Sequence, residues 1–149
     1  MKRSPQRAAA LAGTPDDIEA AFYEALQAGD VERLMACWAD EDEIVCVHPG
    51  GSRLTGAAAI RAAFTAMLEH GGLNVHPVQA GRVQALASSV HSVAEHVRVV
   101  LPDGPHEAVV LATNVYHKTP QGWRLVAHHA SAGSLHEAEV AGPVRHMLH

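Results

Sequence analysis

Residues 38–61 carry the sequence WADEDEIVCVHPGGSRLTGAAAIR, and the rest of the fold is organised around this stretch. It predicts the end of a helix, a short buried strand (IVCV), a sharp turn and the start of another helix. Pro49 lacks a backbone N–H and favours an extended conformation at His48, and the two glycines that follow permit the turn. The His48 imidazole therefore stands at the mouth of a strand, where it either faces a cavity or bonds to water or a nearby carbonyl group.

The composition limits the classes of function. The 149 residues suffice for one domain with its own core, and 48% hydrophobic with 18% charged residues is typical of a soluble globular protein. The formal net charge is -5 and no block of Lys or Arg occurs, so we expect neither nucleic acid nor a membrane as a partner. Cys37 and Cys46 lack metal-ligand spacing, which predicts buried free thiols and a reducing, cytoplasmic location.

The ends of the chain differ from the middle. The first 13 residues hold three basic residues before an alanine-rich run that is too short for the apolar region of a signal peptide. We interpret residues 1–13 as a disordered tail, residues 14–133 as a single α+β domain, and residues 134–149, which show no clear period, as an irregular tail.

Three amphipathic helices are predicted in the first half of the domain. Thr14 has the place of an N-cap, Pro15 that of the first helical residue, and Asp17 completes a capping box. A second, shorter helix begins after Asp30 and extends to the tryptophan at position 38. A third runs from about residue 56 to the glycine pair at 71–72, and each helix has one apolar face for a shared core.

The second half changes from helical to alternating periodicity. Strands are predicted over residues 73–86, with a break or bulge at Gly81, and over residues 90–101, 106–118 and 123–131. Because the links between them are short, neighbouring strands pair antiparallel as a meander. The fold class is therefore α+β, with a curved antiparallel sheet packed on three N-terminal helices.

Strand alternation also places polar side chains. Asn114 shares a face with the small Ala112, which suggests either a polar group lining a space or an amide bonded within the sheet. In the last strand the face that carries Trp123 is the one expected to meet the helices, which directs His129 inward and His128 outward.

No motif for a bound ion or cofactor is present. The histidines do not follow a metal-ligand spacing, although His48 and His129 with a third distant group remain an open alternative for a metal site. Neither a glycine-rich phosphate loop nor a nucleophile elbow occurs, so no metal and no cofactor are expected.

Several short motifs together resemble the SnoaL-like branch of the nuclear transport factor two superfamily. They are QAGD at 27–30, WAD at 38–40, HPGG at 48–51, LTG at 54–56, AIR at 59–61 and GWRLVAHHAS at 122–131. The resemblance implies a cone-shaped fold of the cystatin-like type, an apolar cavity inside the cone and a homodimer. This fold hosts isomerases, cyclases, dehydratases and plain binding modules, so it does not specify an activity.

Ketosteroid isomerases, members of the same superfamily, imply roles for individual residues. Their catalytic base precedes the proline after the first strand, and His48 has that place here. Their oxyanion site pairs a tyrosine with a protonated aspartic acid, and the matching positions here carry Phe22 and Asn114. Neutral imidazole accepts a proton near pH 7, and an amide donates to a developing oxyanion.

The leading hypothesis is a cofactor-independent isomerase, cyclase or lyase that acts on a small apolar carbonyl compound. His48 would be the base, Asn114 the donor and His129 a proton partner. The residues expected to contact the substrate are Phe22, Trp38, Ala112, Tyr116 and Trp123. The alternatives are a non-catalytic module of the same fold, for ligand binding or dimeric assembly, and a metal-dependent enzyme that uses the histidines.

Overall fold

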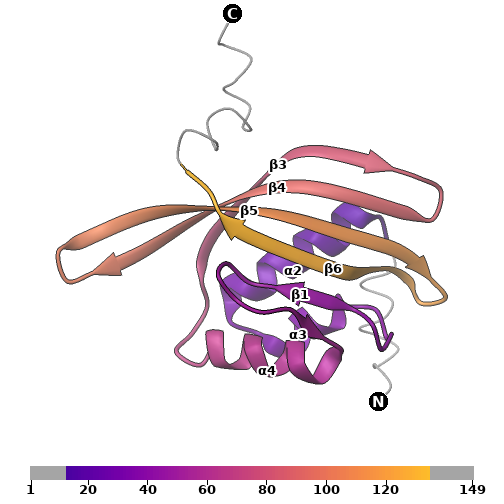
Figure 1. The fold of residues 1–149 in the computed structure, drawn as a ribbon, viewed down its shortest axis with the longest axis horizontal. Helices are drawn as coiled ribbons and strands as arrows, with labels where there is room; N and C mark the ends of the chain where they lie inside the picture. Colours follow the sequence, from indigo (N-terminus) through magenta and orange to yellow (C-terminus); the bar gives the residue numbers. More distant parts are fainter. Residues whose placement is uncertain (1–12, 135–149) are drawn as a thin grey trace, which may run out of the picture.

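The computed structural model describes residues 13–134, which form helices packed on one six-stranded sheet (Figure 1). The helices are α2 (Pro15–Ala28), α3 (Val31–Ala36) and α4 (Ala57–Met67). The strands are β1 (Val45–Val47), β2 (Leu54–Thr55), β3 (Asn74–Gln84), β4 (Ser88–Leu101), β5 (Gly104–Thr119) and β6 (Gly122–Ala132). The order across the sheet is β2-β1-β6-β5-β4-β3, and the predicted α+β fold class is confirmed.

The helix ends follow the capping chemistry of the sequence. Thr14 Oγ1 accepts the Asp17 backbone N–H at 3.2 Å, and the Asp17 carboxylate accepts the Thr14 N–H at 2.9 Å. Gly29 ends α2 with φ of 70°, and a Cβ there would lie 2.9 Å from a backbone nitrogen, so glycine is required. Asp30 then caps α3 by accepting a backbone N–H at 3.0 Å. The predicted starts of both helices are confirmed.

The four long strands form the predicted antiparallel meander, and β1 adds an unpredicted parallel pairing with β6. The register places Cys46 beside His128, so the strand that leads to His48 lies next to the last strand of the chain. The β3–β4 register shifts between Gln79 and Gly81, where a bulge was predicted. A second shift leaves Val126 of β6 as an extra residue, which the sequence analysis did not predict.

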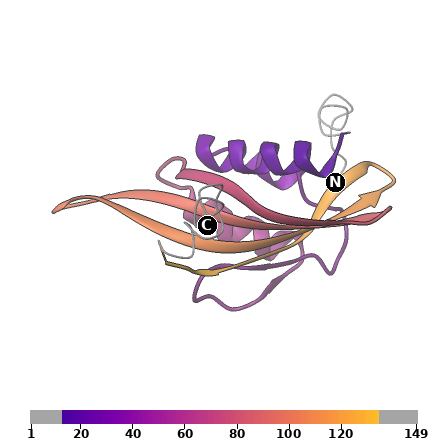
Figure 2. The same cartoon turned by 90° about the horizontal axis from the view of Figure 1, so that it is seen from above.

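The core lies between the helices and one face of the sheet, with α2 running along that face (Figure 2). The rings of Phe22 and Phe64 meet edge to face with centroids 6.0 Å apart, and Trp38 is 1% exposed among them. The predicted terminal tails lie outside the described residues, apart from Gly13 and Ser134. Within residues 13–134, none of the helices has the length and apolar character that crossing a membrane requires.

Candidate active site

A cavity of about 170 Å³ lies between α2, α4 and the inner face of the sheet. Its wall is mainly apolar, with contributions from Leu26, Phe64, Met67, Val75, Val97 and Val110. Three titratable side chains interrupt this wall: His48, Glu95 and His128. A space of roughly 150 Å³ accommodates a benzene-sized ring, so the cavity fits a molecule of about one small ring.

His48 follows β1 and is held by the turn beyond it. An N–H donates to the His48 carbonyl oxygen at 2.8 Å across the turn, and Gly50 supplies the required positive φ of 74°. The imidazole packs edge to face on Phe64 with ring centroids 4.9 Å apart, and its Nε2 lies 3.6 Å from Cys46 Sγ. Burial lowers the pKa of His48, so the ring is neutral at pH 7.

A protonated thiol lies beside one ring nitrogen of His48. Burial, reinforced by the charge of Glu95, raises the pKa of Cys46 to about 12, so the thiol keeps its proton at neutral pH. A thiol S–H that donates to Nε2 favours the tautomer with the proton on Nδ1. In that tautomer the other ring nitrogen of His48 carries an N–H donor.

Glu95 projects from β4 toward the helices and is only 7% exposed. The Tyr23 hydroxyl of α2 donates to Glu95 Oε2 at 2.6 Å, while Oε1 has no hydrogen-bond partner within residues 13–134. Burial, with a contribution from the charge of Glu19, raises the pKa of Glu95 to about 7, although the Tyr23 hydrogen bond opposes this rise. A carboxyl group that is half ionised near neutral pH suits proton transfer in either direction.

His128 lies on β6 and is 4% exposed. Its Nδ1 is 2.6 Å from Asn114 Oδ1, and its ring lies 5.4 Å from that of Phe22 and 6.2 Å from that of His48, measured between centroids. Burial, assisted by the positive charges that His48 and His129 carry when protonated, lowers the pKa of His128 to about 3. Both imidazoles at this cavity are therefore neutral at pH 7.

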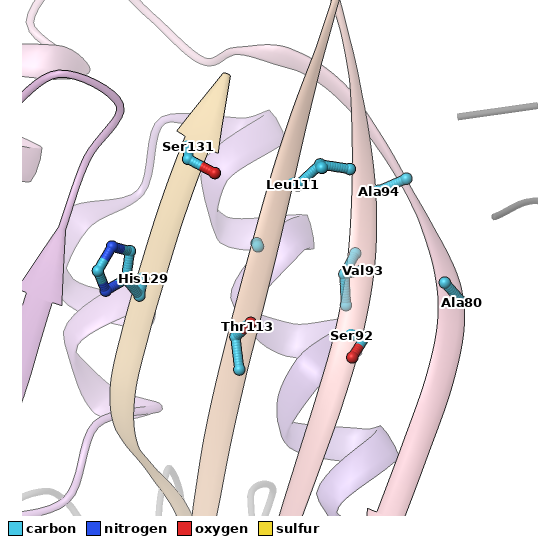
Figure 3. A pocket seen from close by; sticks show the side chains of 9 residues that line it. Ala80, Ser92, Val93, Ala94, Leu111, Thr113, His129 and Ser131 are labelled. Carbon is cyan, nitrogen blue, oxygen red and sulfur yellow. The ribbon is translucent and has the colours of Figure 1, made fainter. Parts of the chain in front are cut away.

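Of the three residues predicted to act in catalysis, only His48 borders the cavity. Asn114 is fully buried behind it, with Nδ2 at 3.1 Å from the Tyr23 hydroxyl and Oδ1 on His128, so it connects the polar groups without lining the space. The predicted inward orientation of His129 is wrong. His129 is exposed and lines a hollow on the outer face of the sheet, with α2 on the far side (Figure 3).

The bulge in β6 explains this difference. Tyr116 pairs with Leu125, but Val115 pairs with Ala127, so Val126 is the additional residue in β6. An extra residue reverses the alternation beyond it, which turns His128 inward and its neighbour outward.

The residues predicted to contact substrate all belong to the hydrophobic core and do not line the 170 Å³ cavity: Phe22, Trp38, Ala112, Tyr116 and Trp123. Sequence reasoning missed Glu95, Tyr23 and His128. A signal for Glu95 was present, because it alternates with Val93 and Val97 on the apolar face of its strand, where a charged residue is unusual. Within residues 13–134, no group of three or more His, Cys, Asp or Glu side chains is arranged to hold a metal ion.

Similar proteins agree with this fold. Residues 16–134 match the model of the SnoaL-like domain family, and no curated protein matches the chain. A candidate calcium/calmodulin-dependent protein kinase type II association domain from Thiobacillus denitrificans is 32% identical, with a TM-score of 0.75, over 83% of this chain and 98% of its own. A candidate dehydratase of the NTF2-like family from Streptomyces avermitilis is 26% identical, with a TM-score of 0.68, over 78% of this chain and 92% of its own.

A ketosteroid isomerase-like protein from Erwinia carotovora atroseptica is 15% identical with a TM-score of 0.68, over 88% of this chain and 99% of its own. At that identity the likeness concerns the fold alone. The family match, by contrast, spans most of the chain, and the Thiobacillus protein is similar over nearly its whole length. The chain therefore belongs to the SnoaL-like family of the nuclear transport factor 2-like superfamily.

Proposed function

We propose that this protein is an enzyme that transfers a proton next to the carbonyl group of a small, largely apolar molecule bound in the cavity. The observation that carries the proposal is Glu95, a buried carboxyl group with a pKa of about 7 and one oxygen without a hydrogen-bond partner within residues 13–134. A carboxyl group with a pKa near the working pH is present in part as the base, and once protonated it can return the proton to the same molecule.

The roles follow from the hydrogen bonds. Ionised Glu95 removes the proton from the carbon next to the carbonyl group, and the electron pair of that C–H bond moves onto the carbonyl oxygen. Neutral His48 donates from Nδ1 to this oxygen, as a neutral imidazole does when its pKa is depressed. The mainly apolar wall around them lowers the local dielectric constant, which strengthens both interactions. The structure thus supports His48 as an electrophile rather than as the base expected from sequence.

Hydrogen–deuterium exchange tests this proposal without knowledge of the natural substrate. Cyclohexanone, a single-ring ketone, is incubated with the protein in deuterated buffer, and loss of the signals beside its carbonyl group is followed by proton NMR. We expect the wild-type protein to accelerate exchange above the rate in buffer alone, with a rate that rises with pH through about 7. In Glu95→Gln the rate should fall by roughly 10²- to 10⁴-fold. His129→Gln, on the outer face, is the matched control and keeps the wild-type rate. Equal exchange in wild type and Glu95→Gln would overturn the proposal.

A second role, assembly with another copy of the chain, is favoured by the outer face of the sheet. This face carries a hollow of about 510 Å³ beside Leu111, Thr113 and His129 (Figure 3). Ala80, Ala94 and Leu111 contribute apolar side chains to the wall of this hollow. An apolar, hollowed sheet surface is a usual place for a second subunit, and the similar Thiobacillus protein is itself a candidate association domain.

A further inference from the structure

A buried cluster behind the cavity fixes the direction of the hydrogen bonds that reach it. The Glu19 carboxylate, on α2, accepts the Tyr116 hydroxyl at 2.9 Å and the Asn114 amide at 3.4 Å, and it lies 2.8 Å from His91 Nδ1. Because a carboxylate only accepts, the amide nitrogen of Asn114, and not its oxygen, must face Glu19.

A second contact requires the same orientation of Asn114. The Tyr23 hydroxyl uses its only proton to donate to Glu95, so at its other neighbour, 3.1 Å away, it must accept from the Asn114 amide nitrogen. Glu19 and Tyr23 are two independent partners, and both require the amide nitrogen of Asn114 to face them. The Asn114 oxygen is thereby directed to His128, 2.6 Å from Nδ1.

This fixed amide determines the tautomer of His128. An amide oxygen cannot donate, so the hydrogen bond requires the proton of His128 to be on Nδ1. The ring is neutral at pH 7, since its pKa is lowered to about 3, and Nε2 therefore carries a lone pair. Within residues 13–134, Nε2 has no hydrogen-bond partner, and His128 lines the cavity.

We propose that the ligand of this cavity is a small hydroxy-carbonyl compound whose hydroxyl group donates to Nε2 of His128. A lone pair at the wall of an apolar space loses its water when a ligand enters, and only a ligand that brings a donor compensates for that loss. The carbonyl part of this ligand class rests on the proposed function, whereas the hydroxyl part rests on the tautomer of His128 alone.

The tautomer also distinguishes between two outcomes of proton removal. A hydroxyl group two carbons from the carbonyl carbon would leave as water only with a proton donor beside it, and Nε2 has no proton to give. A hydroxyl group on the carbon next to the carbonyl group cannot be expelled after proton removal, and its isomerisation needs no donor at Nε2. Glu95 takes the proton from the carbon that bears the hydroxyl, the new carbon–carbon double bond forms, and the carbonyl electron pair moves to oxygen beside His48. Glu95 then returns a proton to the former carbonyl carbon while the hydroxyl proton passes to the other oxygen, which yields the isomeric hydroxy ketone with all atoms and electrons balanced.

The tautomer is tested directly by NMR. Two-bond proton–nitrogen correlations of the ¹⁵N-labelled wild-type protein, assigned with His128→Phe, distinguish a proton on Nδ1 from one on Nε2. We expect Nδ1–H. In Asn114→Leu the preference of His128 for the tautomer with the proton on Nδ1 should weaken. In Asn114→Asp, which keeps an oxygen toward His128, this preference should return. A proton on Nε2 in the wild-type protein would overturn the proposal, whether or not either variant folds.

Ligand selectivity is tested with 2-hydroxycyclohexanone, cyclohexanone and 2-methoxycyclohexanone, which share one ring and differ in the donor. We expect the hydroxy compound to bind roughly 10- to 100-fold more tightly than the other two in NMR titrations. His128→Phe should remove this difference, and the matched control His129→Phe should keep it. Equal affinities in the wild-type protein would refute the hydroxyl contact. Because these measurements involve no turnover, absence of catalysis would contradict only the proposed function.

Discussion

Substitution of Glu95 by Gln should stabilise this protein above neutral pH, and the size of the effect follows from the burial of the carboxyl group. The ordinary pKa of 4.5 applies in the unfolded chain, and about 7 applies in the fold. Each pKa unit corresponds to ~1.36 kcal/mol, so ionised Glu95 costs the fold about 3 kcal/mol once both states are deprotonated. Glutamine keeps an oxygen for the Tyr23 hydroxyl and carries no charge.

The sign follows from proton linkage. A raised pKa means that the folded state binds more protons between pH 4.5 and about 7, so wild-type stability falls as pH rises through this window. Urea unfolding of wild type and Glu95→Gln at pH 4, 5.5, 7 and 8.5 isolates the contribution of Glu95, because all other titrations cancel in the difference. We expect the two proteins to have nearly equal free energies of unfolding at pH 4. At pH 8.5 the free energy of unfolding of the variant should be larger by about 3 kcal/mol. A difference that does not change with pH would refute the assignment of a raised pKa to Glu95.

Two further predictions concern the neighbours of the site and the outer sheet face. Tyr23→Phe removes the hydrogen bond that favours ionised Glu95, so the pH midpoint of deuterium exchange should move upward from about 7. An unchanged or lower midpoint would contradict this role of the tyrosine. If the outer face joins two copies, sedimentation at micromolar concentration should give twice the chain mass for wild type and the single mass for Leu111→Glu. Leu86→Glu, at a position that is 94% exposed, adds the same charge as a control and should leave the dimer intact; a monomeric wild type would exclude this assembly.

Local signals in the sequence predicted most of the fold. The capping residues Thr14 and Asp30 predicted two helix starts, and alternation along β5 placed Asn114 on the same face as Ala112, where both are buried. Such signals depend only on residues that are close in the chain, so they can be interpreted without knowledge of the tertiary structure. The pairing of three-residue β1 with β6 depends on contacts between distant segments, and no local pattern predicts it.

The site was harder to predict because it depends on one bulge. Residues of β6 before Val126 follow the expected alternation, and residues after it are reversed, which exchanges the roles of His128 and His129. A bulge depends on how the partner strand packs, and Val126 has no special backbone requirement that would reveal it in the sequence. The inward orientation of Glu95, in contrast, can be predicted from the alternation of side chains along β4. The same alternation placed the side chains of the neighbouring strands.

A comparison of Glu19 and Glu95, the two buried glutamates within residues 13–134, shows why Glu95 is the proposed base. Glu19 receives donors from Tyr116 and Asn114 and lies against His91, so its hydrogen-bonding capacity is used within the protein. Within the described part of the chain Glu95 receives a donor from Tyr23 alone, and it borders the cavity. Both carboxyl groups are buried, but only the second can exchange a proton with a bound molecule without first breaking an internal hydrogen bond. The same network that engages Glu19 also orients Asn114 and His128, so Glu19 shapes the cavity wall beside the proposed base.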